Sequence, residues 1–150
     1  EEIRANNISG PIEIGNVGSG IDQFLETVSG RIDTERASSL RAKSISGSIR
    51  FNSDGKDLDI NTTSGRVHGE VAGLDPGGSV EIHTISGAVE LQVFPGLDAD
   101  LELRSVSGSV SCEFPVRITE QRRNRLVGKV GDGTVPFEVN TVSGRISIGR

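Results

Sequence analysis

The sequence predicts an all-β fold, a single-domain β-solenoid of about eight irregular coils of 16–22 residues. Three observations predict it. A short motif recurs along the chain: a small polar residue, then a residue that is usually aliphatic, then Ser, Gly, one variable residue and an aliphatic residue. Apolar and polar residues alternate on the way into and out of each motif, as in half-buried strands. No segment shows the apolar stripe of an amphipathic helix.

The motif occurs seven times, with its glycines at Gly10, Gly30, Gly47, Gly65, Gly87, Gly108 and Gly144. The first six are 17 to 22 residues apart, whereas the last gap is 36 residues. Because this gap is about two periods, we expect a degenerate copy at residues 125–130, with Gly128 in the glycine position. The eight glycines are predicted to form corners, where a positive φ turns one strand into the next.

Positions counted from the glycine keep one residue type from copy to copy. The second residue after it is Ile or Val in all seven copies, and the fifth before it is apolar. The third before it is Asn, Ser or Thr, and the residue directly before it is always Ser. Stacked coils would align these side chains into two ladders that satisfy corner backbone groups. A meander of antiparallel hairpins with Ser-Gly tips is the alternative, although it explains the constant columns less well.

Composition restricts the fold and the function classes. The chain has 150 residues and no Met at position 1, so we expect one domain, residues 1–150, excised from a longer chain. Only 33% of residues are hydrophobic, which predicts a thin core of stacked Val, Ile and Leu. The net charge of −5 argues against a nucleic-acid partner. No apolar run approaches the ~20 residues of a membrane span, so we expect no direct membrane insertion.

No pattern of reactive residues predicts catalysis, a metal or a cofactor. Seven equivalent serines cannot all be nucleophiles, and the G-x-S-x-G elbow is missing. His68 and His83 occupy different strand positions, and the single Cys112 lies two coils from His68, so we expect no zinc site. Asp57 and Asp59 resemble a carboxylate pair, but residues two apart on a strand merely share a face, and no Trp or Tyr offers a sugar platform. We therefore predict that the protein is not an enzyme.

An acidic column is one candidate binding surface. Acids recur six residues before the glycine, at Asp59, Glu81, Glu102 and Glu138. The first three are expected to stack on one outer face about 4.8 Å apart, and Arg122 would fall between Glu102 and Glu138 if Gly128 is a corner. Such a column could bind a cation or a basic partner. A solvated face compensated by neighbouring charges is the favoured interpretation.

A basic segment is the second candidate, formed by Arg117, Arg122, Arg123, Arg125 and Lys129. It could contact an anionic polymer or acidic lipid headgroups. The simpler interpretation, which we favour, is a solvated loop that ends the regular stacking.

The repeated Thr-Val-Ser-Gly-Arg-Ile text resembles the DUF4097-type family of β-strand-repeat adhesins, over nearly the whole chain. The most specific part runs from residue 114 to 148, where a basic segment, Gly128-Lys-Val-Gly-Asp-Gly133, Val135-Pro-Phe and Thr141-Val-Ser-Gly-Arg-Ile-Ser-Ile148 follow in the family's order. The resemblance implies a bacterial β-helical domain outside the cytoplasm or attached to the cell envelope. It implies no catalytic residues.

We therefore expect a non-catalytic cell-envelope module for adhesin-type surface recognition or scaffolding, whose partner is a surface polymer or a protein. The alternative is a scaffold that self-assembles into homo-oligomers through its terminal coils. A polysaccharide-active enzyme is the third and least favoured hypothesis.

Overall fold

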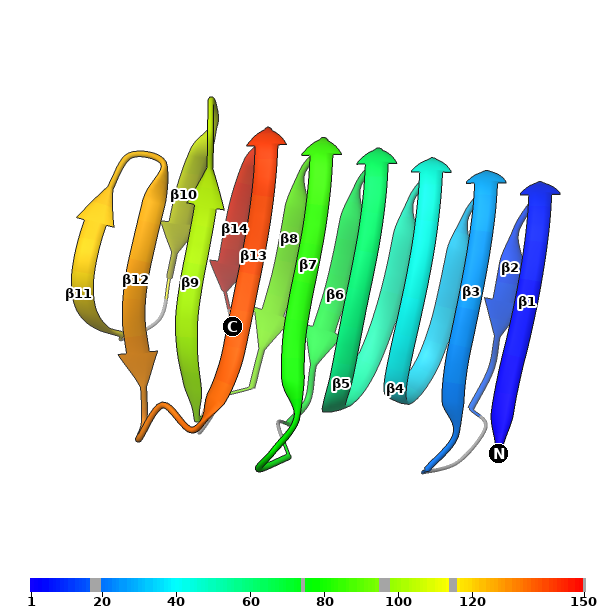
Figure 1. The fold of residues 1–150 in the computed structure, drawn as a ribbon, viewed down its shortest axis with the longest axis horizontal. Helices are drawn as coiled ribbons and strands as arrows, with labels where there is room; N and C mark the ends of the chain where they lie inside the picture. Colours follow the sequence, from blue (N-terminus) through cyan, green and yellow to red (C-terminus); the bar gives the residue numbers. More distant parts are fainter. Residues whose placement is uncertain (17–19, 74, 95–97, 114–115, 150) are drawn as a thin grey trace.

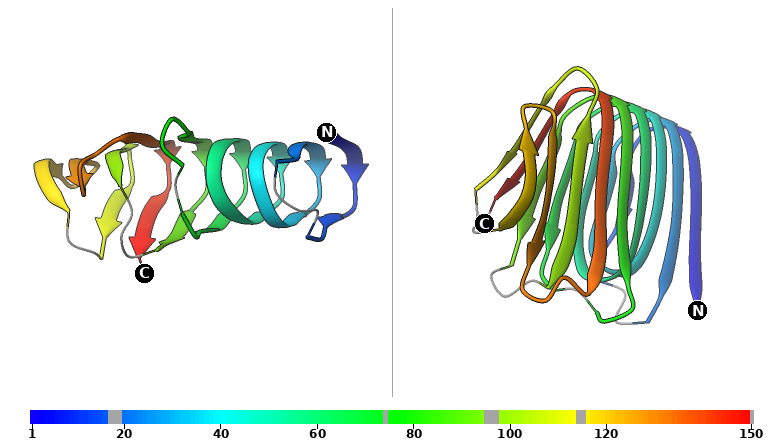
Figure 2. Two further views of the ribbon diagram at one scale, coloured as in Figure 1. Left: turned by 90° about the horizontal axis from the view of Figure 1, so that it is seen from below. Right: turned by 60° about the vertical axis from the view of Figure 1, so that its left-hand side comes forward.

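In the part of the chain that the structure describes, fourteen β-strands join into one sheet that curls over on itself (Figures 1 and 2). The structure is a computed structural model and describes residues 1–16, 20–73, 75–94, 98–113 and 116–149. Within these ranges we find no helix long and apolar enough to cross a membrane.

The chain rises on one face of the curl, turns at a Ser-Gly corner and returns on the other face. The rising strands are β1 (Glu2–Ser9), β3 (Asp22–Ser29), the second halves of β4 (Ile32–Ser46) and β5 (Ile49–Ser64), β7 (Ser79–Ser86), β9 (Ala99–Ser105) and β13 (Val135–Ser143). The returning strands are β2 (Ile12–Ile14), the first halves of β4 and β5, β6 (Val67–Val71), β8 (Val89–Val93), β10 (Ser109–Cys112) and β14 (Arg145–Gly149). We call a rising strand and the strand that returns from it a rung.

Neighbouring rungs pair parallel and in register, so that Leu40, Leu58 and Val80 lie opposite one another on successive strands. This pairing confirms a solenoid-like all-β fold and excludes the meander of hairpins, whose neighbours would run antiparallel. The core is thin, as predicted. It consists of aliphatic columns on the inner side of the curl, with Phe51 filling the space that Gly69 leaves on the next strand.

The order of rungs in space differs from their order in the sequence at one place. Strand β13 pairs with β7 on one side and with β9 on the other, and β14 lies between β8 and β10 (Figure 1). The C-terminal rung is therefore inserted between two rungs that precede it. Its core residues are fully buried, namely Val135, Phe137, Val139, Ile146 and Ile148.

The prediction of an eighth corner at Gly128 is wrong. Gly128 lies inside β12 (Arg125–Val130), which runs antiparallel to β9 and forms a hairpin with β11 (Arg117–Arg122). A Cβ on Gly128 would meet Val116 and the backbone of Arg117, which explains the glycine without a corner. The long gap between Gly108 and Gly144 thus holds an antiparallel hairpin that extends the sheet beyond β9. The predicted count of about eight coils is therefore not confirmed.

The seven remaining glycines are corners, and they stack in the spatial order Gly10, Gly30, Gly47, Gly65, Gly87, Gly144 and Gly108. A Cβ on any glycine after the first would collide with the carbonyl oxygen of the glycine in the preceding rung. The backbone angle φ is +115° at Gly10, but it is not positive at Gly30, Gly108 or Gly144. The shared requirement is therefore close backbone approach, and the positive φ that we predicted applies to only some corners.

Candidate functional site

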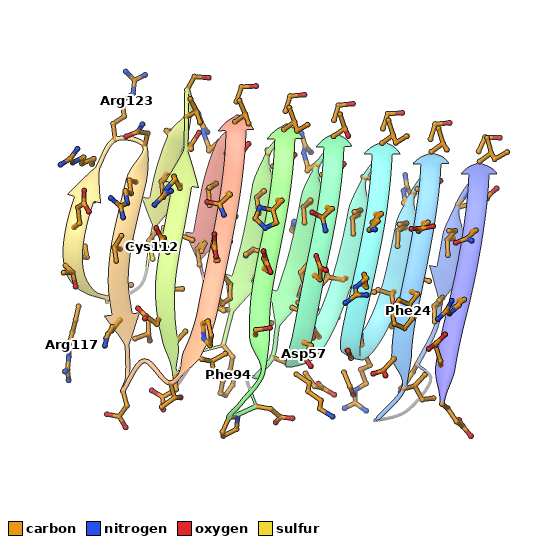
Figure 3. The ribbon with its side chains drawn as sticks, in the orientation of Figure 1. Phe24, Asp57, Phe94, Cys112, Arg117 and Arg123 are labelled. Carbon is orange, nitrogen blue, oxygen red and sulfur yellow. The ribbon has the colours of Figure 1, made fainter. Side chains whose placement is uncertain are left out.

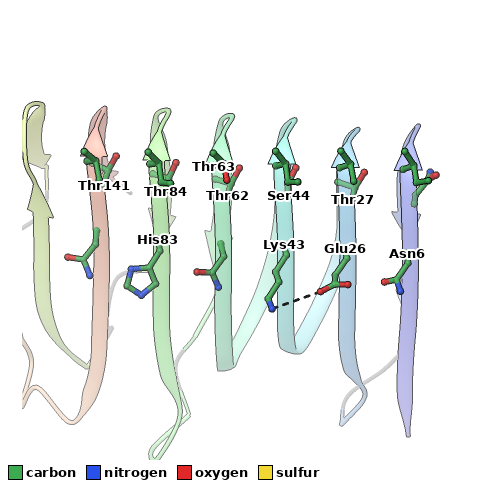
Figure 4. Close-up of a pocket in the computed structure, with 18 of the residues that line it drawn as sticks. Asn6, Glu26, Thr27, Lys43, Ser44, Thr62, Thr63, His83, Thr84 and Thr141 are labelled. Carbon is green, nitrogen blue, oxygen red and sulfur yellow. Dashed lines mark ion pairs between the residues drawn. The ribbon is translucent and has the colours of Figure 1, made fainter.

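A groove with a volume of about 1170 Å³ runs along the edge of the sheet that the seven corners form, across the rising strands (Figure 4). We call this edge the corner edge. Two rows of outward-facing side chains flank the groove. They are the residues four and two positions before each glycine, which point to the same face because side chains alternate along a strand. The residues three before the glycine point inward beneath it, as the burial of Thr27, Thr62 and Thr84 shows.

The upper row, which we call the crest, consists in spatial order of Ile8, Val28, Ile45, Thr63, Ile85, Val142 and Val106. Its six aliphatic members are 44% to 76% exposed. At a strand spacing of about 4.8 Å, the crest is about 29 Å long. Exposed aliphatic side chains that lie side by side over such a length usually mark an interaction site.

The lower row, which we call the polar row, consists of Asn6, Glu26, Lys43, Asn61, His83, Asn140 and Arg104. The Nζ of Lys43 lies 4.0 Å from Oε1 of Glu26 (Figure 4). The remaining polar contacts run downward, to acids on the same strands. Nε2 of His83 is 2.6 Å from Oε1 of Glu81, so the imidazole is held against a carboxylate at the groove wall.

The four predicted acids form one continuous row on the rising face. Asp59, Glu81, Glu138 and Glu102 lie opposite one another on the consecutive strands β5, β7, β13 and β9. The sequence predicted that only three would be neighbours, whereas the inserted C-terminal rung places Glu138 between Glu81 and Glu102. The predicted position of Arg122 is wrong, because Arg122 lies on β11 opposite Arg125.

Each acid of this row has a partner on its own strand. The side-chain amides of Asn61 and Asn140 donate to Asp59 at 2.6 Å and to Glu138 at 2.5 Å. His83 contacts Glu81, and Nη2 of Arg104 lies 2.6 Å from Oε1 of Glu102. Among the described residues, no group of His, Cys, Asp and Glu is arranged to hold a metal ion. Each carboxylate of the row thus already has a hydrogen-bond or ion-pair partner.

The predicted basic segment is the β11–β12 hairpin, and its arginines have two different roles. Arg125 bridges two strands, with Nη1 3.1 Å from Glu120 and Nη2 3.4 Å from Glu102. Arg122 also pairs with Glu120, at 3.1 Å. Arg117 and Arg123 are exposed at opposite ends of the hairpin (Figure 3). The ion pair of Arg125 with Glu102 links the hairpin to β9, whereas Arg122 pairs within β11.

A cluster that we did not predict surrounds Phe24. The guanidinium groups of Arg4 and Arg41 lie 5.2 and 5.3 Å from the centre of its ring, one on each neighbouring strand. Arg4 donates a hydrogen bond to the Glu2 carboxylate, and this bond and the negative charge of Glu2 raise the pKa of Arg4. All three residues lie six before a glycine, in the column that continues with Asp59. The sequence already places these residues in that column, but a search of the column for acids alone does not find them.

In the part of the chain that the structure describes, the other reactive side chains lie at separate places on the sheet. Nδ1 of His68 lies 3.5 Å from Oε2 of Glu90. His68 is on a returning strand, β6, whereas His83 is on a rising strand, β7. Cys112 is half-buried in β10. Asp57 accepts a hydrogen bond from Ser79 at 3.4 Å. Among the described residues, His68, His83, Cys112 and Asp57 thus lie on four different strands.

One of the two predicted hydroxyl ladders is confirmed. The hydroxyls of Ser29, Ser46 and Ser64 donate to crest carbonyl oxygens of the preceding rung at 3.4 to 3.5 Å. The second ladder is buried but mostly unbonded. Among the described atoms, only Ser105 donates, to the carbonyl of Gly144 at 3.3 Å. The hydroxyls without a partner are those of Thr27, Ser44, Thr62, Thr84 and Thr141.

The fold and the groove define a class of protein: a solenoid-like β-repeat protein whose exposed feature is a long, repetitive corner edge. The chain belongs to the Toastrack DUF4097 family, whose model matches residues 1–149. The match confirms the family that the repeated motif suggested, and its description names no activity. Neither the curated proteins nor the solved structures gave a match.

Proposed function

We propose that the chain is a non-catalytic recognition module of the bacterial cell envelope, placed outside the cytoplasm, that binds its partner along the corner edge. The observation that carries this proposal is the crest. Six aliphatic side chains at least 44% exposed form a single row, although the fold has an inner face that could have buried them. Exposing such a row to water is unfavourable unless a partner covers it.

The groove beside the crest supports recognition of an extended partner. Its walls repeat at every strand, with aliphatic side chains on one side and amide, imidazole and charged groups on the other. A site of this kind offers the same contacts many times over. A catalytic pocket instead gathers a few different groups at one point.

Binding to isolated cell envelopes tests the proposal. The variant Val28→Thr, Ile45→Thr, Ile85→Thr gives three crest positions the residue that Thr63 already places there, so the fold should be retained. We expect the wild type to sediment with envelopes in physiological salt and this variant to lose that binding. The control Phe94→Ser, Ile118→Thr removes two apolar side chains that are exposed away from the crest. Equal binding by both variants, or no binding by the wild type, would contradict the proposal.

A self-assembling scaffold is the second candidate, because both ends of the described sheet keep an unpaired strand edge. Strands β1 and β2 lie at one end, and β11 and β10 lie at the other (Figure 1). Open edges can pair with another chain. Light scattering over a wide concentration range tests this function, and a mass that stays monomeric throughout would contradict it. No arrangement among the described residues favours a polysaccharide-active enzyme.

A further inference from the structure

We propose that the corner edge docks on the surface of an anionic lipid bilayer. In this arrangement the crest enters the interfacial region and a row of arginines binds lipid phosphates. The inference rests on the proposed function, because it names the partner of the same edge. The sheet itself stays outside the hydrocarbon.

The arginines occupy the position directly after the corner glycine. In spatial order this position holds Pro11, Arg31, Ser48, Arg66, Ala88, Arg145 and Ser109. Arginine thus stands on alternate rungs, about 9.6 Å apart. All three arginines are exposed, and none forms an ion pair within the described part of the chain. Free guanidinium groups suit phosphate, which they bind through two parallel hydrogen bonds.

Charge is distributed unevenly between the two edges of the sheet. In each of the seven copies, the residues from the crest residue to the one directly after the glycine include no Asp or Glu. The whole chain nevertheless contains 21 acids and has a net charge of −5. Acids gather instead toward the edge opposite the corners, in bends, loops and the start of β9, at Glu35, Asp54, Asp57, Asp75, Asp98, Asp100 and Asp132 (Figure 3 labels Asp57). A negatively charged surface would attract the corner edge and repel the opposite one, so it would orient the protein.

The geometry favours a flat partner over a linear one. The crest follows the rising strands and the arginines follow the returning strands, so the two rows lie on opposite shoulders of the corner edge. A polymer or a helix in the groove would touch the crest and the polar row but would miss the arginines. A bilayer can contact both shoulders along the whole edge. Aliphatic side chains flanked by cations are the usual means of interfacial attachment.

Sedimentation with vesicles tests this docking, using the 150-residue chain. We expect binding to vesicles of phosphatidylcholine and phosphatidylglycerol at three to one, weak binding to phosphatidylcholine alone, and weakening by added salt. The variant Arg31→Ser, Arg66→Ser, Arg145→Ser copies Ser48 and Ser109 and should bind about a hundredfold more weakly, since each arginine contributes about fivefold near such a surface. The control Arg36→Ser, Arg50→Ser, Arg117→Ser changes the net charge equally at exposed positions outside the two rows and should bind like the wild type.

Three outcomes would overturn the docking. The first is no binding of the wild type to the anionic vesicles, and the second is equal weakening in the two arginine variants. The third is binding to soluble polyphosphate that is as tight as to vesicles and is unaffected by the crest substitutions, because a polymer would then be the partner. If the crest variant loses binding to whole envelopes while purified vesicles stay unbound, only the bilayer inference fails. Recognition at the corner edge would stand.

Discussion

Phe137 lies directly opposite Leu101 in the parallel pairing of β13 with β9. On its other side it lies opposite Val80 of β7. A residue near the C-terminus thus separates two strands that come before it in the sequence. The same insertion makes the acidic row continuous, puts Val142 between Ile85 and Val106 in the crest, and places Arg145 in the alternating arginine row. The acidic row and the corner edge therefore both depend on the C-terminal rung.

Phe137→Ala should lower the free energy of unfolding by about 3–5 kcal/mol, because it removes a fully buried ring from the rung that joins β7 to β9. Chemical denaturation measures the change. Phe94→Ala is the control, since this ring is 57% exposed and should contribute little. Similar midpoints for the two variants would mean that the C-terminal rung is not inserted at this place.

Gly87→Ala should lower the free energy of unfolding by about 2 kcal/mol, because the new Cβ would collide with the carbonyl oxygen of Gly65 and the corner backbones would have to separate. Gly15→Ala is the matched control, since a Cβ there meets no atom within 4 Å. Thermal unfolding of both variants measures the difference. An unchanged midpoint for Gly87→Ala would show that the corners do not stack.

Thr84→Val should raise the free energy of unfolding by about 1 kcal/mol. The side chain is buried and its hydroxyl has no partner, so a methyl group of similar size avoids the cost of burying an unbonded polar group. Thr119→Val, at an exposed position of β11, should leave stability almost unchanged. A loss of stability in Thr84→Val alone would indicate that this hydroxyl is hydrogen-bonded.

Calcium should not stabilise the protein, despite the row of four acids. The neighbouring Asn61, His83, Asn140 and Arg104 already contact these carboxylates, and a cation would have to displace them. Melting temperatures in calcium chloride and in sodium chloride of equal ionic strength should agree. A rise specific to calcium would reveal a metal site, because a ligand that binds only the folded state stabilises it.

Much of the fold could be predicted from columns of residues. The period near 20, the parity of Ile and Val around each Ser-Gly and the absence of helical patterns correctly predicted parallel rungs with a thin aliphatic core. The candidate surfaces were predicted less well. The acidic column was identified, but the residue two before each glycine was treated only as a member of the corner motif. The significance of the crest as a surface became clear only from the exposure, in the folded structure, of Ile8, Val106 and the four aliphatic residues between them.

The sequence by itself determined what each rung contains, because inward and outward positions follow from strand parity and from the corner within a single repeat. It could not determine the order of the rungs. Each rung carries nearly the same pattern of inward and outward residues. Strand β9 could therefore pair equally well with β7 or with β13, and the residues of a single rung do not decide between these two neighbours. Tertiary structure decided the order: the antiparallel hairpin around Gly128 brings the chain back beside β9, and the short connection at residues 131–134 then places β13 between β9 and β7.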